Sequence, residues 1–146
     1  IGGERPSTTK LRQVYSLLFP DATIVKTGSK TAEMVKYMTN TFLATKVSFA
    51  NEMKMICDEL KIDYDKVVEY STYDERLGKS HWAVPGPDGK MGFGGSCFPK
   101  DINALIALSK DMRLYLHTLQ SVWKTNLKVR PEQDWKELKG RAVTDE

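Results

Sequence analysis

The sequence lacks the long apolar runs and the cysteine pattern of membrane and secreted proteins. No apolar run approaches the ~20 residues that a membrane-spanning helix requires, and the first residues do not form a signal peptide. The two cysteines, Cys57 and Cys97, are far apart in sequence and give no disulfide framework. We therefore expect a cytoplasmic protein without a membrane partner.

The sequence also has little excess charge and few histidines. Its 22 basic and 19 acidic residues leave a net charge of +3, too small and too evenly spread to indicate a nucleic-acid partner. His81 is one of two histidines, and no second ligand is spaced to form a metal site with it. The 146 residues suit one domain, or one domain and a fragment. Because the chain begins at Ile1 without an initiator methionine, we expect a fragment, a processed product or a cloned piece.

The most informative stretch that is present reads GFGGSCFPKD and covers residues 92–101. Its glycines allow the backbone to approach a ligand closely. Pro99 suits the first turn of a helix, and the N-terminus of that helix together with Lys100 would favour the thiolate of Cys97. Asp101 would then be placed to act as a base toward water beside the cysteine.

Two other interpretations of this stretch exist. The glycines are equally compatible with a simple turn, in which Cys97 would be a small apolar core residue. A dinucleotide-binding loop fits less well, because Cys97 stands where the third glycine of that fingerprint belongs and no β-rich segment precedes it. The residues alone leave both a nucleophilic and a structural role open for Cys97.

An uninterrupted helical pattern predicts one long helix over about residues 31–60. It contains no glycine or proline, and Ser29 is a candidate cap. At the standard rise per residue the helix would be about 45 Å long. An apolar stripe runs along it, formed by Val35, Met38, Phe42, Phe49, Met53, Ile56 and Leu60. Such a helix is typical of one that packs against several partners or a second subunit.

Shorter elements are expected on both sides of the long helix. A helix that begins near Ser7, followed by a strand at residues 22–25, would be half of an α/β unit. The later elements are a short helix within residues 61–78, a long loop over 79–96, and helices over about 100–111 and 114–127. Beyond Arg130 the sequence becomes charged.

Lys36 and Asn40 lie four residues apart on the long helix and therefore share one face. A fixed cation and an amide donor stabilise charge that develops on a substrate oxygen. An ordinary solvated pair on the helix surface also explains this spacing, and the spacing alone favours it.

Three stretches, in the same order, resemble the UDP-glucose/GDP-mannose dehydrogenase family. The GFGGSCFPKD stretch is similar to the active-site cysteine motif of that family. Residues 32–46 with Asn51 and Glu52 match a second motif, and residues 74–78 match a third. Together they cover about residues 29–110, which resemble the central helical domain of the family.

The resemblance implies a mainly α fold. Its helical central domain would be built on the long helix and preceded by a helix–strand remnant of a Rossmann α/β domain. Residues 1–28 would be the C-terminal end of the NAD-binding Rossmann domain. Residues 29–128 would form the central helical domain for dimerisation and the catalytic cysteine. Residues 129–146 would be a charged tail or a connector to a missing C-terminal domain.

The resemblance also implies part of an NAD-dependent UDP-glucose 6-dehydrogenase. It would oxidise UDP-glucose twice, through a cysteine thiohemiacetal and thioester. This chain would be inactive alone, because NAD would be held mainly by a missing domain. Its partners would be a nucleotide sugar, UDP-glucose above all, and a second copy bound through the long helix. The implied residues are Cys97, Lys36, Asn40 and Asp101 for catalysis, Arg76 (across the dimer), Phe93 and Gly94 for substrate binding, and Lys100 for the cofactor.

Two alternatives stay open beside this hypothesis. The shared motifs do not distinguish UDP-glucose from GDP-mannose or UDP-N-acetylmannosamine as the substrate. The chain would also fit a helical dimerisation module that has lost its chemistry.

Overall fold

A computed structural model describes residues 1–138 and 140 of the chain. These residues form a mainly helical protein, as predicted, and they divide into two compact units, Ile1–Thr39 and Asn40–Glu146. The elements are α1 (Ser7–Leu18), α2 (Ser29–Leu60), α3 (Tyr64–Ser71), η1 (Glu75–Leu77), α4 (Cys97–Asp111), α5 (His117–Val129) and η2 (Asp134–Glu137). Of the predicted tail, residues 139 and 141–146 lie outside the described residues.

The strand predicted at residues 22–25 is wrong. These residues have no strand, and the pairing of this segment is a single parallel bridge between Gly2 and Thr27. The amide of Gly3 donates to the carbonyl of Thr27 at 3.1 Å, and the amide of Thr27 donates to the carbonyl of Ile1 at 3.0 Å. A strand needs neighbouring strands to pair with. The first unit offers it only the few residues that precede α1, so the Rossmann strand remnant is not seen.

The long helix α2 agrees with the prediction. Its 32 residues run on because neither glycine nor proline interrupts them. It ends where Lys61 adopts a left-handed φ of 57°. Asp63 then caps α3, since its carboxylate accepts the backbone N–H groups of Asp65 and Lys66 at 3.0 and 3.3 Å.

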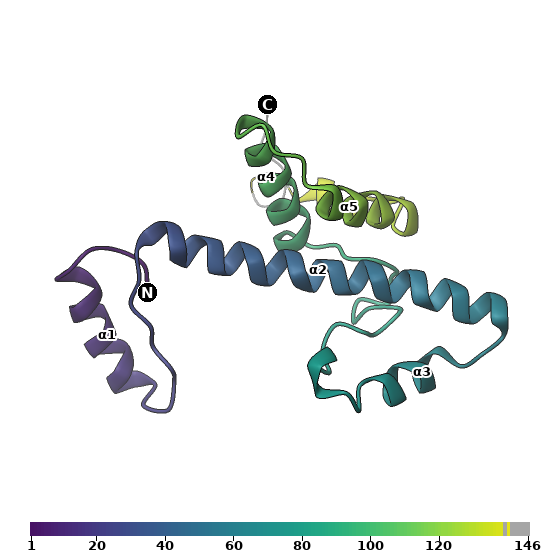
Figure 1. Cartoon of the computed structure of the whole chain (residues 1–146), viewed down its shortest axis with the longest axis horizontal. Helices are drawn as coiled ribbons and strands as arrows, with labels where there is room; N and C mark the ends of the chain where they lie inside the picture. Colours follow the sequence, from purple (N-terminus) through teal and green to yellow (C-terminus); the bar gives the residue numbers. More distant parts are fainter. Residues whose placement is uncertain (139, 141–146) are drawn as a thin grey trace. The chain divides into compact units, whose positions relative to one another are not determined.

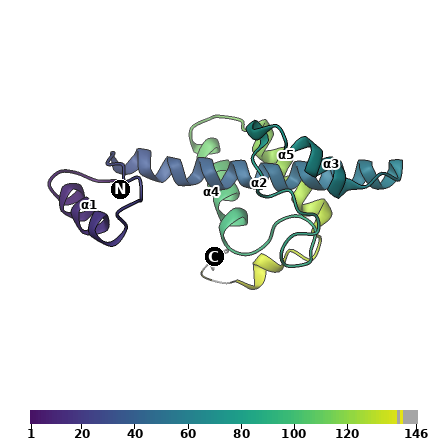
Figure 2. The ribbon, with the colours of Figure 1, turned by 90° about the horizontal axis from the view of Figure 1, so that it is seen from below.

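Two clusters of buried side chains form the core of the second unit. The first, which joins α2, α4 and α5 to the glycine-rich loop, contains Ala44, Phe93, Ile102 and Val122. The second, which joins α2 and α3 to the long loop, contains Ala50, Cys57, Tyr64 and Val84. In Figure 1, α4 and α5 lie on one side of α2 and α3 lies on the other, and Figure 2 shows α4 crosswise to α2. Both clusters use α2, which makes it the central element of this unit.

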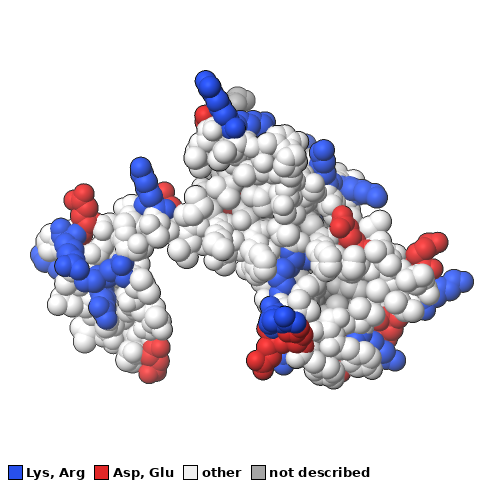
Figure 3. Space-filling model, in the orientation of Figure 1, with Lys and Arg blue, Asp and Glu red and all other residues white. Residues whose placement is uncertain are grey.

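Much of the predicted apolar stripe on α2 faces solvent. Phe42 and Leu60 are each 63% exposed, and Ile56 is 50% exposed. Met53 instead packs against the second core cluster. In the view of Figure 3, the charged side chains of the second unit lie mostly toward its edges. An exposed apolar row of this kind is typical of an interaction surface.

Within the described residues, no helix combines the length and the apolar character that a membrane span requires.

Candidate functional site

Cys97 is the first residue of α4 and is exposed to solvent. The helix starts before the predicted boundary near residue 100, because Pro99 is accommodated in its first turn. The hydroxyl oxygen of Ser96 lies 4.0 Å from the Cys97 sulfur. Cys57, by contrast, is 4% exposed within the second core cluster. The two thiols therefore differ sharply in access to solvent.

One turn further along α4, the carboxylate of Asp101 is completely buried. The side-chain amide of Asn40 donates to its Oδ2 at 2.6 Å, and the ammonium of Lys100 lies 2.5 Å from its Oδ1. A buried carboxylate needs such partners, because burial without them strongly disfavours its charge. The structure thus brings three predicted site residues, Asn40, Lys100 and Asp101, into one hydrogen-bonded group. The four-residue spacing places Asp101 on the same helix face as Cys97.

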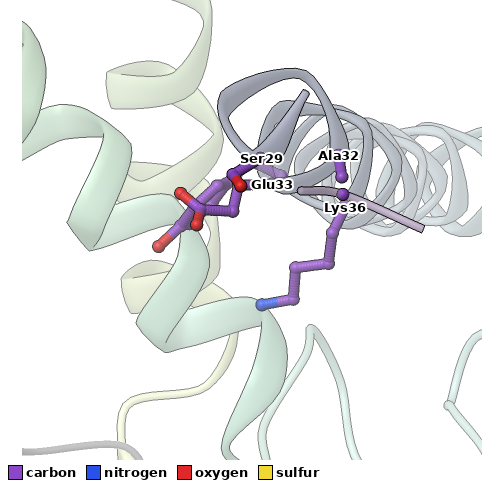
Figure 4. Close-up of a pocket in the computed structure, with 6 residues that line it drawn as sticks. Ser29, Ala32, Glu33 and Lys36 are labelled. Atoms are coloured by element: carbon purple, nitrogen blue, oxygen red, sulfur yellow. The ribbon is translucent and has the colours of Figure 1, made fainter. Parts of the chain in front are cut away.

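Lys36 belongs to the first unit and precedes Asn40 by one turn of α2. Its ammonium lies 5.1 Å from the centroid of the Tyr37 ring. The side chain borders a hollow of about 530 Å³, which Ser29, Ala32 and Glu33 also line (Figure 4). The predicted role of Lys36 toward a substrate oxygen stays a prediction.

Phe93 and Gly94, both predicted to bind substrate, line a cavity of about 500 Å³ in the second unit. The Phe93 ring packs edge-on against the Phe98 ring, with their centroids 5.9 Å apart. The ring of His81 lies 5.9 Å from that of Phe98 on the same cavity wall. His81 has a φ of 67°, which is rare for a residue other than glycine. The cavity thus opens between the long loop and the glycine-rich loop.

Two buried asparagines hold the backbone of the glycine-rich loop. Asn126 accepts the amide of Phe93 at 2.8 Å and donates to the carbonyl of the same residue at 3.0 Å. Asn51 accepts the amide of Gly92 at 3.0 Å. Their exposed fractions are 0% and 1%. The Asn126 side chain therefore pairs with Phe93 as a neighbouring strand would.

Arg130 completes the support of this loop. Its guanidinium binds Asp134 through two hydrogen bonds, of 2.9 and 2.7 Å, and Asp88 through one of 2.7 Å. It also donates to the carbonyl of Met91 at 3.4 Å. Hydrogen bonds to Arg130 lower the pKa values of Asp88 and Asp134, and the pKa of Arg130 is raised chiefly by Asp134. The side chain is 2% exposed, so this is a buried charge with its partners in place.

The sequence did not predict the roles of Asn51, Asn126 and Arg130. Asn51 belongs to a stretch that resembles the family, but no role was expected for it there. The three residues reach the loop across 41, 33 and 39 positions of the chain. The available signal was the position of Arg130 at the end of a helix, shortly before the acidic residues Glu132 and Asp134. Only the folded chain shows which of these form pairs.

Arg76, the third predicted substrate-binding residue, lies in η1 with its side chain 89% exposed. Its guanidinium pairs with Asp74, which lowers the pKa of that carboxyl. The ammonium of Lys46 donates to the carbonyl of Leu77 at 2.9 Å and lies 4.7 Å from the centroid of the Trp82 ring. Burial lowers the pKa of Lys46. Lys46 therefore fixes the end of the short helix that presents Arg76.

No three His, Cys, Asp or Glu side chains of the described region are grouped to hold a metal ion. In the glycine-rich loop, a Cβ added at Gly94 would meet the guanidinium of Arg130. A Cβ at Gly92 would likewise meet the side-chain oxygen of Asn126. Protein side chains fill the positions where these two Cβ atoms would lie, although both glycines also line the cavity described above.

Comparisons with known proteins show a family likeness. The family described as "UDP-glucose/GDP-mannose dehydrogenase family, central domain" matches residues 30–128. The UDP-glucose 6-dehydrogenase TuaD of Bacillus subtilis is 39% identical over 109 residues, which are 75% of this chain and 23% of that protein. The UDP-glucose 6-dehydrogenase of Rickettsia prowazekii is 38% identical over 128 residues, which are 87% of this chain and 28% of that protein.

A solved structure shows the same likeness. The UDP-glucose dehydrogenase of Pyrobaculum islandicum superposes with a TM-score of 0.77 at 34% identity, over 86% of this chain and 28% of that one. The chain thus spans about a quarter of the length of these relatives. It belongs to the UDP-glucose/GDP-mannose dehydrogenase family and corresponds to the central domain of that family.

Proposed function

We propose that this chain is the central part of an NAD-dependent UDP-glucose 6-dehydrogenase, which converts UDP-glucose to UDP-glucuronate. The observation that carries the proposal is the arrangement at the start of α4. An exposed thiol stands one turn before a buried carboxylate that already holds an amide and an ammonium. The names of the relatives support UDP-glucose as the substrate.

In this mechanism Cys97 is the nucleophile. Its sulfur attacks the aldehyde carbon made by the first oxidation, and the carbonyl oxygen becomes the oxygen of a thiohemiacetal. Lys36 would stabilise the negative charge on that oxygen. Loss of a hydride from the same carbon leaves a thioester. Water, oriented by Asn40 and Asp101, then attacks the thioester, the carbon–sulfur bond breaks, and the thiolate is restored.

The two oxidations need a hydride acceptor, for which we propose NAD. The glycine-rich loop fits its phosphate-binding fingerprint poorly, because Cys97 stands where the third glycine belongs. Lys100, whose side chain is 45% exposed, is the residue proposed here to contact the cofactor. The rest of its site would belong to a longer protein, so this chain alone would be inactive.

The partners proposed are a nucleotide sugar and a second copy of the chain. Phe93 and Gly94 would face the sugar nucleotide from the cavity that they line. Arg76 would reach the site of the second copy, which its exposure allows. The exposed apolar row of α2 would be the dimer contact. The domain limits at residues 28 and 128 and a cytoplasmic location remain part of this hypothesis.

A dehydrogenase that acts on GDP-mannose or UDP-N-acetylmannosamine is a second candidate, because the family description includes both nucleotide classes. It would use the same cysteine chemistry and would differ in the residues that contact the nucleotide and the sugar. A non-catalytic dimerisation module is a third, and the exposed thiol of Cys97 argues against it.

Turnover of the full-length gene product with UDP-glucose and NAD tests the proposal. We expect two NADH per sugar from the wild type and a loss of at least about a thousandfold in Cys97→Ser, since the hydroxyl is a far weaker nucleophile. Cys57→Ser is the matched control, because Cys57 is buried in the second core cluster and should affect stability alone.

Two other outcomes of the turnover experiment would change the proposal. Turnover on a different nucleotide sugar would keep the mechanism and change the substrate. A folded full-length protein that oxidises none of the three sugars would favour the dimerisation module.

A further inference from the structure

The glycine-rich loop is fixed from its buried side by residues that lie in and after the last turns of α5. Asn126 binds both backbone groups of Phe93, and Arg130 follows it by one turn. Asn126 is 0% exposed, and the Arg130 side chain is 2% exposed. Their contacts reach Phe93 and Gly94, which are among the loop residues that line the cavity.

Arg130 connects three parts of the second unit: the segment after α5, the long loop, and the start of the glycine-rich loop at Met91. Through Asp134 it binds the segment that follows α5, and through Asp88 it binds the tight turn of the long loop. That turn is closed by a hydrogen bond of 2.8 Å from the amide of Gly86 to the carbonyl of Lys90. Asp88 contributes one oxygen to the amide of Lys90, at 3.1 Å, and the other to Arg130.

Lys90 strengthens the same connection from the surface. Its ammonium lies 3.4 Å from a carboxylate oxygen of Glu132 and 3.5 Å from one of Asp134. The segment after α5 is further anchored by Trp135, which is 4% exposed and lies 5.2 Å from Trp123 between ring centroids. The two loops and this segment are therefore tied into one rigid body around the guanidinium.

We propose that Arg130, together with Asn126, is a positioning residue for the cysteine loop. It fixes Phe93 and Gly94, and so sets the shape of the cavity wall just before Cys97 in the chain. Arg130 acts through the backbone and touches no reacting atom. The guanidinium fork explains why lysine would not replace it, since one ammonium cannot hold Asp134 with two bonds and reach Asp88 and Met91 as well. The catalytic consequence rests on the function proposed above, whereas the structural consequence does not.

The first test uses this chain alone, with the variants Arg130→Lys and Asp88→Asn. Asp88 is 48% exposed, so its substitution removes the loop side of the contact with little risk to folding. Native-state hydrogen exchange is measured at the amides of Gly92 and Phe93. We expect exchange there to accelerate by about tenfold or more in Arg130→Lys, as for a loop that has lost buried hydrogen bonds, and by less in Asp88→Asn.

The buried thiol of Cys57 serves as the internal control. Its reaction with Ellman's reagent requires the core to open, so its rate reports on the unit as a whole. Ser48→Ala is the matched variant, because it removes a buried hydrogen bond of 3.1 Å between α2 and the carbonyl of Val122 and none of the hydrogen bonds that hold the loop. A positioning role predicts faster exchange at Gly92 and Phe93 with an unchanged labelling rate at Cys57. Ser48→Ala should give the reverse pattern.

The second test measures kcat and KM of the full-length gene product. Displacement of the cavity wall should lower kcat/KM by about ten- to a hundredfold in Arg130→Lys. Ser48→Ala, compared at equal thermal stability, should stay within about twofold of the wild type.

Two results would overturn the proposal. One is unchanged exchange at Gly92 and Phe93 in both loop variants, and the other is an equal rise in Cys57 labelling, which would make Arg130 a general stabiliser. If the wild type oxidises no nucleotide sugar, the proposed function fails, and the exchange and labelling data on this chain still decide the role of Arg130.

Discussion

Gly94 shows how a single residue depends on a side chain that is remote in sequence. Its φ lies outside the left-handed region, so its backbone would tolerate alanine, but an added Cβ would meet the guanidinium of Arg130. The sequence suggested a close approach between this glycine and a ligand. The structure explains the glycine by the nearby guanidinium of Arg130, which leaves no room for a side chain. The predicted contact of Gly94 with substrate stays a prediction.

Gly94→Ala should therefore destabilise the protein by about 1–3 kcal/mol, the usual cost of an extra methyl group in a packed site. Urea unfolding followed by circular dichroism measures this loss. Gly28→Ala is the control, because nothing lies within 4 Å of the added Cβ, and its effect should be within about 0.5 kcal/mol. Equal stability of the two variants would show that Arg130 yields to the methyl group.

Tyr64 is a second residue whose environment the fold decides. It is 4% exposed, and its hydroxyl donates to the carbonyl of Trp82 at 2.7 Å. Burial, with smaller contributions from the nearby charges of Asp65 and Cys57, raises the pKa of Tyr64 to about 12. Because the pKa is higher in the folded protein, the resulting stability is present below about pH 10 and is lost as the pH rises toward 12.

A spectroscopic titration of tyrosinate should show one of the six tyrosines ionising late, near pH 12. In Tyr64→Phe this late step should vanish while the others remain. Circular dichroism at each pH confirms that the protein is still folded. A single step near pH 10 for all six in the folded state would contradict the assignment.

At the scale of elements, the connection between the long loop and the segment after α5 depends on charge. Arg130 lowers the pKa values of Asp88 and Asp134 below 3.8, their ordinary value. A lowered carboxyl pKa contributes stability that is present above about pH 4 and disappears as the pH falls through the lower folded value. The loop contact should therefore weaken in acid before the helices melt.

The wild type should lose more free energy of unfolding between about pH 6 and pH 3 than Asp134→Asn does, because asparagine has no proton to gain. Urea unfolding at both pH values gives the comparison. Asp58→Asn is the control, since Asp58 pairs with Lys54 on the exposed side of α2 and should keep the acid sensitivity of the wild type. If Asp134→Asn lost as much stability in acid as the wild type, other carboxyl groups would be responsible for the acid sensitivity.

At the scale of the whole molecule, the exposed apolar row of α2 fits a second copy of the chain. Phe42 is 63% exposed near the middle of the helix, far from either end. A charge at this position would face its own copy or other apolar side chains across a dimer interface, and either arrangement is unfavourable.

Phe42→Glu should weaken self-association by about tenfold or more, as measured by sedimentation velocity over a range of concentrations. Leu108→Glu on α4 places the same charge at a site that is 46% exposed and should leave association unchanged. A wild type that is monomeric at all concentrations, or a Phe42→Glu variant that associates like it, would move the dimer contact elsewhere.

The sequence by itself determined most of the helices and the position of the chemistry. The absence of glycine and proline over 32 residues dictates α2, and the order of three motifs identifies the family. These features are local, since each depends on neighbours within a few turns or on the order of residues along the chain. The strand expected at residues 22–25 failed for the opposite reason, because a strand depends on partners that this chain does not place beside it.

Only the tertiary structure decided what surrounds the thiol. The bond between Asn40 and Asp101 spans 61 positions, and the contact of Arg130 with Asp88 spans 42. Such pairs depend on how α2, α4 and α5 pack, which no periodicity or local motif encodes. The tertiary structure also decided which side chains of α2 are buried. Ala44 and Ala50 are buried, whereas Phe42 is exposed to solvent. Hydrophobicity alone would have buried the phenylalanine first, and the packing of neighbouring helices determines which face of α2 is covered.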